Sequence, residues 1–342
     1  MTPRKSGRIR GNLLRAVAIV ALAAAIAFAL LLFDSVSGRD WQMKKVVIPR
    51  KSTLADITSL FRQEKILPHP LAFRALVLLT GTSRRLHYGE YTFPAPPSAF
   101  ETWRRIVAGD VIKYSVTVPP GANLFDIASL LGEMSLADPK AFLDAATSRD
   151  TLARLGIRGK SAEGYLFPDT YVLVKTLSPE EILEIMVRQF WKKFTPETEK
   201  RAKEEGLTVS QVVTIASIIE KETSTEEEKP LVSAVIRKRL ALGMPLQMDP
   251  TVIYGAKRFD GTVTRKDLQA EGPYNTYRNR GLPPGPIANP GMPAILAALA
   301  PAKTDYLYFV SNNDGSHVFS RTLPEHLRAV EKFRRSVRAE KR

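Results

Sequence analysis

The chain has 342 residues, of which 25% are charged and 44% hydrophobic, and its formal net charge is +15. This length and composition are typical of about two folded domains with a sizeable core. The absence of cysteine excludes disulfides, a cysteine nucleophile, a zinc–thiolate site and an acylated cysteine anchor. The basic balance favours anionic partners, but no compact basic and aromatic motif points to nucleic acid.

Residues 16–33 are consecutive apolar residues, and at about 1.5 Å per residue they are long enough to cross the hydrocarbon layer of a membrane. Residues 1–15 carry basic residues and no acid, which predicts a cytoplasmic basic tail before the span. We therefore expect an uncleaved, single-pass anchor in the inner membrane, followed by a linker at residues 34–45 and a periplasmic remainder. The alternative is a cleaved signal peptide, with Ser35-Val36-Ser37 as its cleavage site.

An internal repeat with an offset of about 70 residues follows the linker. Residues 46–49 match residues 116–119, and residues 91–94 match residues 165–168. Alternating β-branched residues that end at a proline predict strands, and Leu and Ile at three- and four-residue steps predict the helices between them. Each copy is thus predicted as strand, helix, short helix, strand. This pattern resembles the glycan-binding LysM module, which we place at residues 46–115; a scaffold repeat without a binding role is the alternative.

The second copy closes on Glu163-Gly-Tyr-Leu-Phe-Pro-Asp-Thr-Tyr171. Aromatic faces stack on the C–H groups of pyranose rings and carboxylates accept hydrogen bonds from hydroxyls, so the segment predicts a sugar-facing surface. Its candidate substrate contacts are Tyr165, Phe167 and Asp169; an ordinary amphipathic strand with a Pro-Asp turn is the alternative. Residues 179–203 are then predicted as one helix, and residues 226–229 as a solvated acidic loop.

Between these two segments, residues 208–223 predict a helix that carries an acid beside an apolar face. Thr208 and Gln211 fit a capping box, and apolar residues recur at helical spacing at Val212, Ile215, Ala216 and Ile219. Glu220 and Glu222 both flank this face, so periodicity does not choose between them. A carboxyl at such a margin loses hydration, which favours the neutral form that a general acid requires. An ordinary acid at the edge of a helix is the alternative.

The segments 247–254, 274–277 and 281–291 are polar, aromatic or rich in Pro and Gly, and we predict that they form the irregular rims of a cleft. Asp249 has a second interpretation, as a cap before Pro250. A short helix at 293–299, a β-hairpin at 306–320 and a basic tail at 326–342 complete the chain. The candidate substrate-binding residues of the three segments are Gln247, Asp249, Thr251, Tyr254, Tyr274, Asn275, Tyr277 and Asn289.

Nucleotide-binding and serine-hydrolase motifs are missing from the sequence, and its four histidines are scattered, which argues against a metal site. Carboxylate chemistry in an aromatic cleft remains, and it points to glycoside cleavage. The blocks at residues 216–223, 247–254, 274–277 and 281–287 resemble the signature of the YceG-like family of endolytic murein transglycosylases. The block at residues 163–171 and the single N-terminal span extend the resemblance from the anchor to Ser320.

The resemblance implies an α+β fold: a transmembrane helix, the LysM-like domain, and a catalytic domain at residues 116–325 around a central helix bearing Glu220. It implies that Glu220 is the catalytic residue, acting without a metal or cofactor. The implied reaction cleaves bonds between N-acetylmuramic acid and N-acetylglucosamine in nascent peptidoglycan strands, leaves 1,6-anhydro ends and limits strand length.

The implied partners are peptidoglycan strands and the inner membrane, and the resemblance leaves open a contact with peptidoglycan synthases. Two alternatives stay open. One is a muramidase-type hydrolase in which Asp169 or Asp249 activates water. The other is a peptidoglycan-binding scaffold without catalysis.

Overall fold

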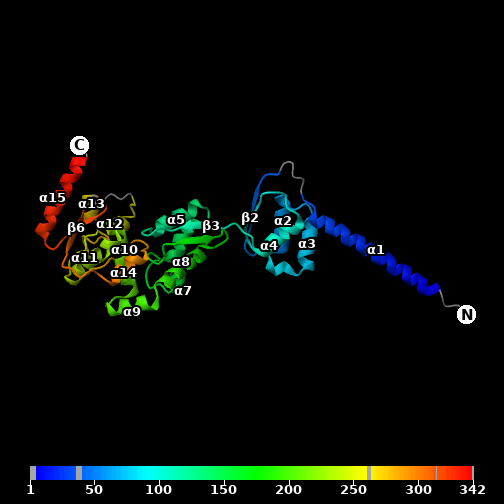
Figure 1. Cartoon of the computed structure of the whole chain (residues 1–342), viewed down its shortest axis with the longest axis horizontal. Coiled ribbons are helices and arrows are strands. Elements are labelled where there is room, and N and C mark those ends of the chain that lie inside the picture. The colour runs from blue at the N-terminus through cyan, green and yellow to red at the C-terminus, as the bar shows by residue number, and fades with distance from the viewer. Residues whose placement is uncertain (1–4, 36–40, 260–262, 313, 341–342) are drawn as a thin grey trace. The chain divides into compact units, whose positions relative to one another are not determined.

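The computed structural model describes residues 5–35, 41–259, 263–312 and 314–340 (Figure 1). The described residues are mostly helical with three two-stranded sheets, which confirms the mixed α+β class. They divide into two compact units, Met1–Tyr114 with Val174–Thr176, and Ser115–Leu173 with Leu177–Arg342. Three predicted features extend outside the described residues: the alternative cleavage site at Val36 and Ser37, the start of the N-terminal basic tail, and the hairpin at Asn313.

Unit 1 contains the first predicted strand-helix-helix-strand copy. Its outer strands pair antiparallel, with Val46 opposite Tyr91, and both side chains are buried. Thr53 forms a capping box with Asp56 at the start of the first helix of the copy. The helix that follows the copy was not predicted. The elements are α1 (Lys5–Phe33), β1 (Lys44–Ile48), α2 (Leu54–Gln63), α3 (Pro70–Leu79), η2 (Thr82–Arg85), β2 (Gly89–Phe93) and α4 (Ala99–Ala108).

Helix α1 is apolar over Asn12–Phe33, a length and composition that would allow it to cross a membrane. Its C-terminal end packs against α3 and α4 (Figure 1). Leu32 is buried in the hydrophobic core of unit 1, and Phe28 packs against the same core. The last turns of the apolar helix are therefore part of a folded unit.

Unit 2 contains the second copy, the Glu220 helix and the C-terminal hairpin. Its elements are β3 (Tyr114–Thr117), α5 (Leu124–Glu133), α6 (Pro139–Thr147), α7 (Arg149–Arg154), β4 (Thr170–Leu173), α8 (Pro179–Lys193), α9 (Pro196–Glu204), α10 (Val209–Glu222), η3 (Glu226–Glu228), α11 (Lys229–Ala241), α12 (Asp249–Ala256), α13 (Arg265–Gln269), α14 (Met292–Leu299), β5 (Tyr308–Ser311), β6 (His317–Ser320) and α15 (Leu323–Glu340).

Two elements of the second copy and its continuation differ from the prediction. The closing strand β4 pairs with β3 and begins after residues 165–168, which were predicted to form it. Those residues include three consecutive buried side chains, whereas a strand with one solvated face alternates. The helix predicted over 179–203 is two helices, because Thr195 caps a new helix that has Pro196 in its first turn.

One prediction in the last third of the chain is also wrong. The segment 247–254 is not irregular throughout, because α12 begins at Asp249 with Pro250 in its first turn. The basic tail predicted from residue 326 is helical as far as it is described, because α15 runs to Glu340 and packs on β5 and β6. The hairpin β5–β6 is confirmed, with Phe309 opposite Phe319.

Helix α10 is the centre of unit 2, and it packs against α14 and α11 (Figure 1). Thr208 and Gln211 form the predicted capping box at its start. Every residue from Val212 to Ile219 is buried, so the helix has core on all sides until its last turn. Ser217 accepts a hydrogen bond from the backbone N–H of Ile287, which fixes the Pro- and Gly-rich segment along the helix.

Candidate active site

Glu220 lies in the last turn of α10 with a side chain that is only 9% exposed. Its Oε1 accepts a hydrogen bond from Lys229 Nζ at 2.7 Å, and its Oε2 accepts one from the backbone N–H of Gly291 at 2.8 Å. Both oxygens of this carboxylate are therefore held by donors from other segments. Gly291 is the N-cap of α14, so the positive end of that helix dipole faces the carboxylate.

A second stretch of backbone, around Gly121, also lies close to Glu220. Gly121 donates to the carbonyl of Asn289 at 2.9 Å, and Lys221 donates to the carbonyl of Gly121 at 3.3 Å. A Cβ on Gly121 would lie 3.8 Å from Glu220 Cγ, and one on Gly291 would lie 3.4 Å from Glu220 Oε2. Backbone thus approaches the carboxylate from two sides.

The segment 226–229, predicted to be a solvated acidic loop, is exposed at Glu226 and Glu227 but buried at its last two residues. Lys229 is 4% and Glu228 9% exposed. Glu228 accepts hydrogen bonds from the His317 backbone N–H and from Thr223 Oγ1, and its Oε2 lies 2.7 Å from His317 Nδ1. Burial opposes its charge, but the hydrogen bonds from His317 and Thr223 outweigh burial and lower the pKa of Glu228. The prediction holds for Glu226 and Glu227 and is wrong for Glu228 and Lys229, because these two charges pair with His317 and Glu220 inside the fold.

Beside this network lies a cavity of about 520 Å³, here called the acidic cavity. Lys229 also donates to the carbonyl of Thr223 at 3.2 Å, so contacts through Thr223, Glu228 and His317 connect Glu220 to the cavity wall. The residues that line the cavity are Glu222, Arg239, Leu246, Gln247, Met248, Asp249, Tyr277, Phe309, Val310, Ser311, His317, His326, Val330 and Arg334. Its volume lies in the range of known ligand pockets, roughly 300–1,000 Å³.

Three of the predicted substrate-binding residues meet in the acidic cavity. Tyr277 donates to Asp249 Oδ1 at 2.6 Å, and Arg239 donates to Gln247 Oε1 at 3.3 Å. Gln247 has a φ of 55°, a left-handed conformation that is uncommon for a residue other than glycine. Such backbone strain is concentrated at functional sites.

Glu222 contributes an unusual carboxyl to the same cavity. Its Oε1 is buried and, in the part of the chain that the structure describes, has no hydrogen-bond partner. Burial, together with the negative charge of Asp249, raises the pKa of Glu222 to about 8. The two acids flanking the apolar face of α10 therefore have opposite surroundings: Glu220 is held by two donors, whereas Glu222 faces a second acid.

A group of buried polar residues supports the surroundings of Glu220. Their burial was not predicted from the sequence. The fully buried Asn289 accepts from the Leu166 N–H and donates to the Ala122 carbonyl, both at 2.9 Å, and to Glu163 Oε1 at 3.1 Å. Burial raises the pKa of Glu163 to about 7, although hydrogen bonds from Leu124 and Tyr254 oppose the shift. Asn289 thus joins three segments rather than facing an open cleft.

Several other predicted contacts are buried as well. Tyr165 and Phe167 are 4% and 7% exposed, so the expected sugar-facing surface is wrong for them: their rings lie in the core, with Tyr165 against Phe190. Thr251 is fully buried and hydrogen-bonds Met248 and Thr276. Sequence pattern alone did not show that these polar and aromatic side chains have partners inside the fold.

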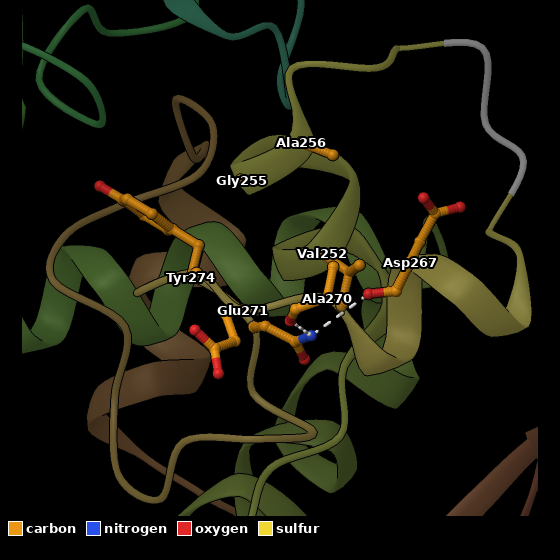
Figure 2. A pocket seen from close by; sticks show the side chains of 9 residues that line it. Val252, Gly255, Ala256, Asp267, Ala270, Glu271 and Tyr274 are labelled. Carbon is orange, nitrogen blue, oxygen red and sulfur yellow. Dashed lines mark hydrogen bonds between the residues drawn. The ribbon is translucent and has the colours of Figure 1, made fainter.

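Figure 2 shows a smaller cavity, next to α12 and α13, whose wall includes Asn275 and Tyr274. Asn275 is buried, and its amide donates to the carbonyls of Asp267, Leu268 and Ala270. The volume is only about 70 Å³, below the range of ligand pockets. Through these hydrogen bonds Asn275 fixes the conformation of the chain between α13 and Tyr277.

The remaining predicted residues lie outside the acidic cavity. The rings of Tyr254 and Tyr274 lie 5.1 Å apart, and Tyr254 also contacts Phe125. Asp169 accepts from Gln189 Nε2 at 2.6 Å and from the N–H of Thr170. Its carboxylate thus ties β4 to α8.

Comparison with known proteins is consistent with this geometry. The model of the YceG-like family matches residues 46–332. The chain belongs to the YceG-like family. It is 33% identical over 303 residues to an endolytic murein transglycosylase of Bacillus subtilis (strain 168), covering 84% of this chain and 83% of that protein. Against the endolytic murein transglycosylase of Streptococcus pneumoniae serotype 2 the identity is 26% over 332 residues, and this chain spans 60% of the length of that protein.

The family fold is also seen in a solved structure. The crystal structure of a YceG-like protein of Listeria monocytogenes matches with a TM-score of 0.59 and 30% identity, over 84% of this chain and 99% of that one. The matched range of the YceG-like family contains Glu220, Lys229, Gly291 and every residue that lines the acidic cavity except Arg334.

Proposed function

We propose that this member of the YceG-like family is an endolytic transglycosylase that cleaves peptidoglycan strands with Glu220 as its catalytic residue. The observation that carries the proposal is the placement of Glu220: a nearly buried carboxylate at a helix end, held by Lys229 and by the N–H of Gly291. Contacts through Thr223, Glu228 and His317 connect it to a polar cavity large enough for sugar residues. The names of the relatives from Bacillus and Streptococcus support the same reaction class.

In the proposed reaction, protonated Glu220 donates its proton to the glycosidic oxygen as the bond from C1 of N-acetylmuramic acid breaks. Lys229 and Gly291 then hold the carboxylate that remains. That carboxylate takes the proton of the C6 hydroxyl, and O6 bonds to C1 to give a 1,6-anhydro end. One acid suffices because the nucleophile belongs to the same sugar, which makes the step intramolecular. Gln247, Asp249 and Tyr277 hydrogen-bond sugar hydroxyl and acetamido groups.

We place the protein in the inner membrane, with α1 as an uncleaved anchor and both units in the periplasm. The support is the packing of α1: cleavage after it would remove Leu32 from the core of unit 1, along with the packing of Phe28. Deleting a buried leucine side chain alone costs about 2–5 kcal/mol. In this proposal the strand-helix-helix-strand copy of unit 1 also contacts glycan, as the LysM resemblance implies.

Mass spectrometry of the products from un-cross-linked glycan strands tests the reaction. We expect ends that are one water lighter than reducing muramic acid, and a loss of roughly 10²–10⁴-fold in rate for Glu220→Gln, the usual contribution of general acid–base catalysis. Reducing ends would instead indicate a hydrolase that uses a second acid. A Glu220→Gln protein as fast as the wild type would refute the role of Glu220.

A further inference from the structure

Helix α3 of unit 1 is apolar on both of its faces. Ala72, Phe73, Leu76 and Val77 are buried against the core. On the opposite side Leu71, Leu78 and Leu79 are 79%, 61% and 77% exposed. Their spacing of seven and eight residues places them on one stripe of the helix. Full burial of a leucine side chain stabilises by about 1.5–3 kcal/mol, so three exposed leucines on two turns favour an apolar partner.

The depth of α3 relative to the proposed membrane anchor follows from contacts within unit 1. Phe28 and Leu32 belong to the apolar segment Asn12–Phe33, and both pack against the folded core. Because α3 and α4 are the elements that touch α1, they must lie at the depth of its last turns. From Phe28 to Phe33 this overlap is about 7–8 Å along the helix axis.

Both ends of α3 are tied to the end of that segment. Before α3, His69 Nε2 lies 2.7 Å from Asp34 Oδ2. After α3, Thr82 accepts a hydrogen bond from Trp103 at 3.0 Å, and ring contacts continue from Trp103 through Phe100 to Phe33. A tryptophan at this level is typical of a membrane interface. Helix α3 thus lies beside the last turns of α1, with the exposed leucines on its free side.

The charges around the leucine stripe suit a phospholipid surface. Arg74 on α3 and Arg84 and Arg85 on η2 are exposed, and residues 70–85 contain no acid. An apolar face flanked by arginines is the composition of helices that lie in the headgroup region of anionic membranes. This charge and the continuity with α1 favour lipid over a second protein chain as the partner.

We propose that Leu71, Leu78 and Leu79 insert into the periplasmic leaflet and that Arg74, Arg84 and Arg85 bind lipid phosphates. Unit 1 is then held to the membrane by α3 as well as by α1. This inference rests on the proposed anchoring by α1. It adds a lipid-binding surface that catalysis by Glu220 does not require.

Because the chain has no cysteine, single-cysteine variants of the full-length protein provide a direct test. Leu78→Cys and Leu79→Cys are labelled with an environment-sensitive fluorophore, and the protein is reconstituted in vesicles of phosphatidylethanolamine and phosphatidylglycerol with or without brominated acyl chains. Leu22→Cys, inside the apolar segment, reports whether α1 inserts. Leu242→Cys, which replaces a leucine of unit 2 that is 56% exposed, is the matched control for exposure.

We expect the labels at 78 and 79 to lose a share of their fluorescence in brominated vesicles comparable with the label at 22, while the label at 242 is unchanged. Quenching at 22 without quenching at 78 and 79 would overturn the α3 surface and leave the anchor in place. Quenching at none of these positions would overturn both. Equal quenching at 242 and 78 would show non-specific adsorption and also refute the proposal.

Discussion

Lys229 Nζ lies 2.7 Å from Glu220 Oε1, and both side chains are less than one tenth exposed. The pair joins the end of α10 to the start of α11, nine residues apart. A buried carboxylate that loses its cation keeps its desolvation cost without the compensating attraction. Lys229 therefore stabilises the fold of unit 2 by pairing with this buried carboxylate.

Replacing Lys229 by methionine tests this pair. We expect the free energy of unfolding of unit 2 to fall by about 3–5 kcal/mol, the usual loss when one partner of a buried ion pair is removed. The double variant Glu220→Gln/Lys229→Met should recover part of that loss, because no charge is left unpaired. Lys192→Met, which replaces an exposed lysine of α8, is the control and should change stability by at most about 0.5 kcal/mol. Denaturant titration followed by Trp191 fluorescence, in a Trp41→Phe/Trp103→Phe background, measures unit 2 alone.

Glu222 gives a prediction for pH. The unfolded chain loses this proton near the ordinary pKa of 4.5, whereas the folded chain keeps it until about 8. Between these values the folded state binds more protons, so its stability falls as the pH rises from about 5 to 8. Glu163, with a pKa of about 7, adds to the fall over the lower part of this window.

The variant Glu222→Gln should abolish the Glu222 part of this dependence. At pH 4, below the ordinary pKa of 4.5, we expect its melting temperature to match the wild type, and at pH 8 to exceed it. Thermal melts of both proteins at half-unit pH steps measure the difference. A gap between the two proteins that is constant across pH would show that Glu222 is ionised throughout.

Glycine 164 supports the site by allowing a close approach of three segments. Its φ is +86°, and an added Cβ would lie 2.6 Å from atoms of Pro286 and Val213. Gly164→Ala should therefore lower stability by more than the left-handed strain of about 1–2 kcal/mol, and it should shift the Pro- and Gly-rich segment off α10. Gly156 is the matched control, with φ +73° and no atom within 4 Å of a Cβ, so Gly156→Ala should show the strain alone. Equal losses in the two variants would contradict this account.

Tyr277 tests the acidic cavity. Its hydroxyl donates to Asp249 at 2.6 Å, and a hydrogen bond to a charged group contributes about 1.5–3 kcal/mol. If this bond orients Asp249 toward glycan, Tyr277→Phe should raise KM by about 10-fold or more with little change in kcat. Tyr306→Phe, outside the cavity, should leave KM unchanged. A loss confined to kcat would place Tyr277 in the chemical step instead.

Local signals in the sequence predicted the elements that are defined by their own residues. The capping box of Thr208, the apolar face of α10 and the Asp-Gly hairpin depend on neighbours within a few positions. The same reasoning failed where a distant partner decides the structure. Lys229 was predicted to be solvated because no neighbouring residue in the sequence indicates that it pairs with Glu220. Tyr165 and Asn289 were predicted to contact sugar because composition cannot show their partners inside the fold. Tyr165 packs against Phe190, and Asn289 donates a hydrogen bond to Glu163.

The position of Asn289 also has a consequence for the order in which this protein forms. Its amide bonds the carbonyl of Ala122, 167 residues earlier in the chain, and the Gly291 N–H that holds Glu220 comes 71 residues after that acid. At usual rates of synthesis, roughly ten to thirty seconds separate Ala122 from Asn289. Glu220 is made part-way through that interval, and for roughly four to fourteen seconds, until Gly291 is added, the growing chain contains the acid without its backbone donor. Ribosome-bound chains that end between Glu220 and Asn289 therefore carry the acid but not the assembled site, and the site forms only when nearly all of the protein has been made.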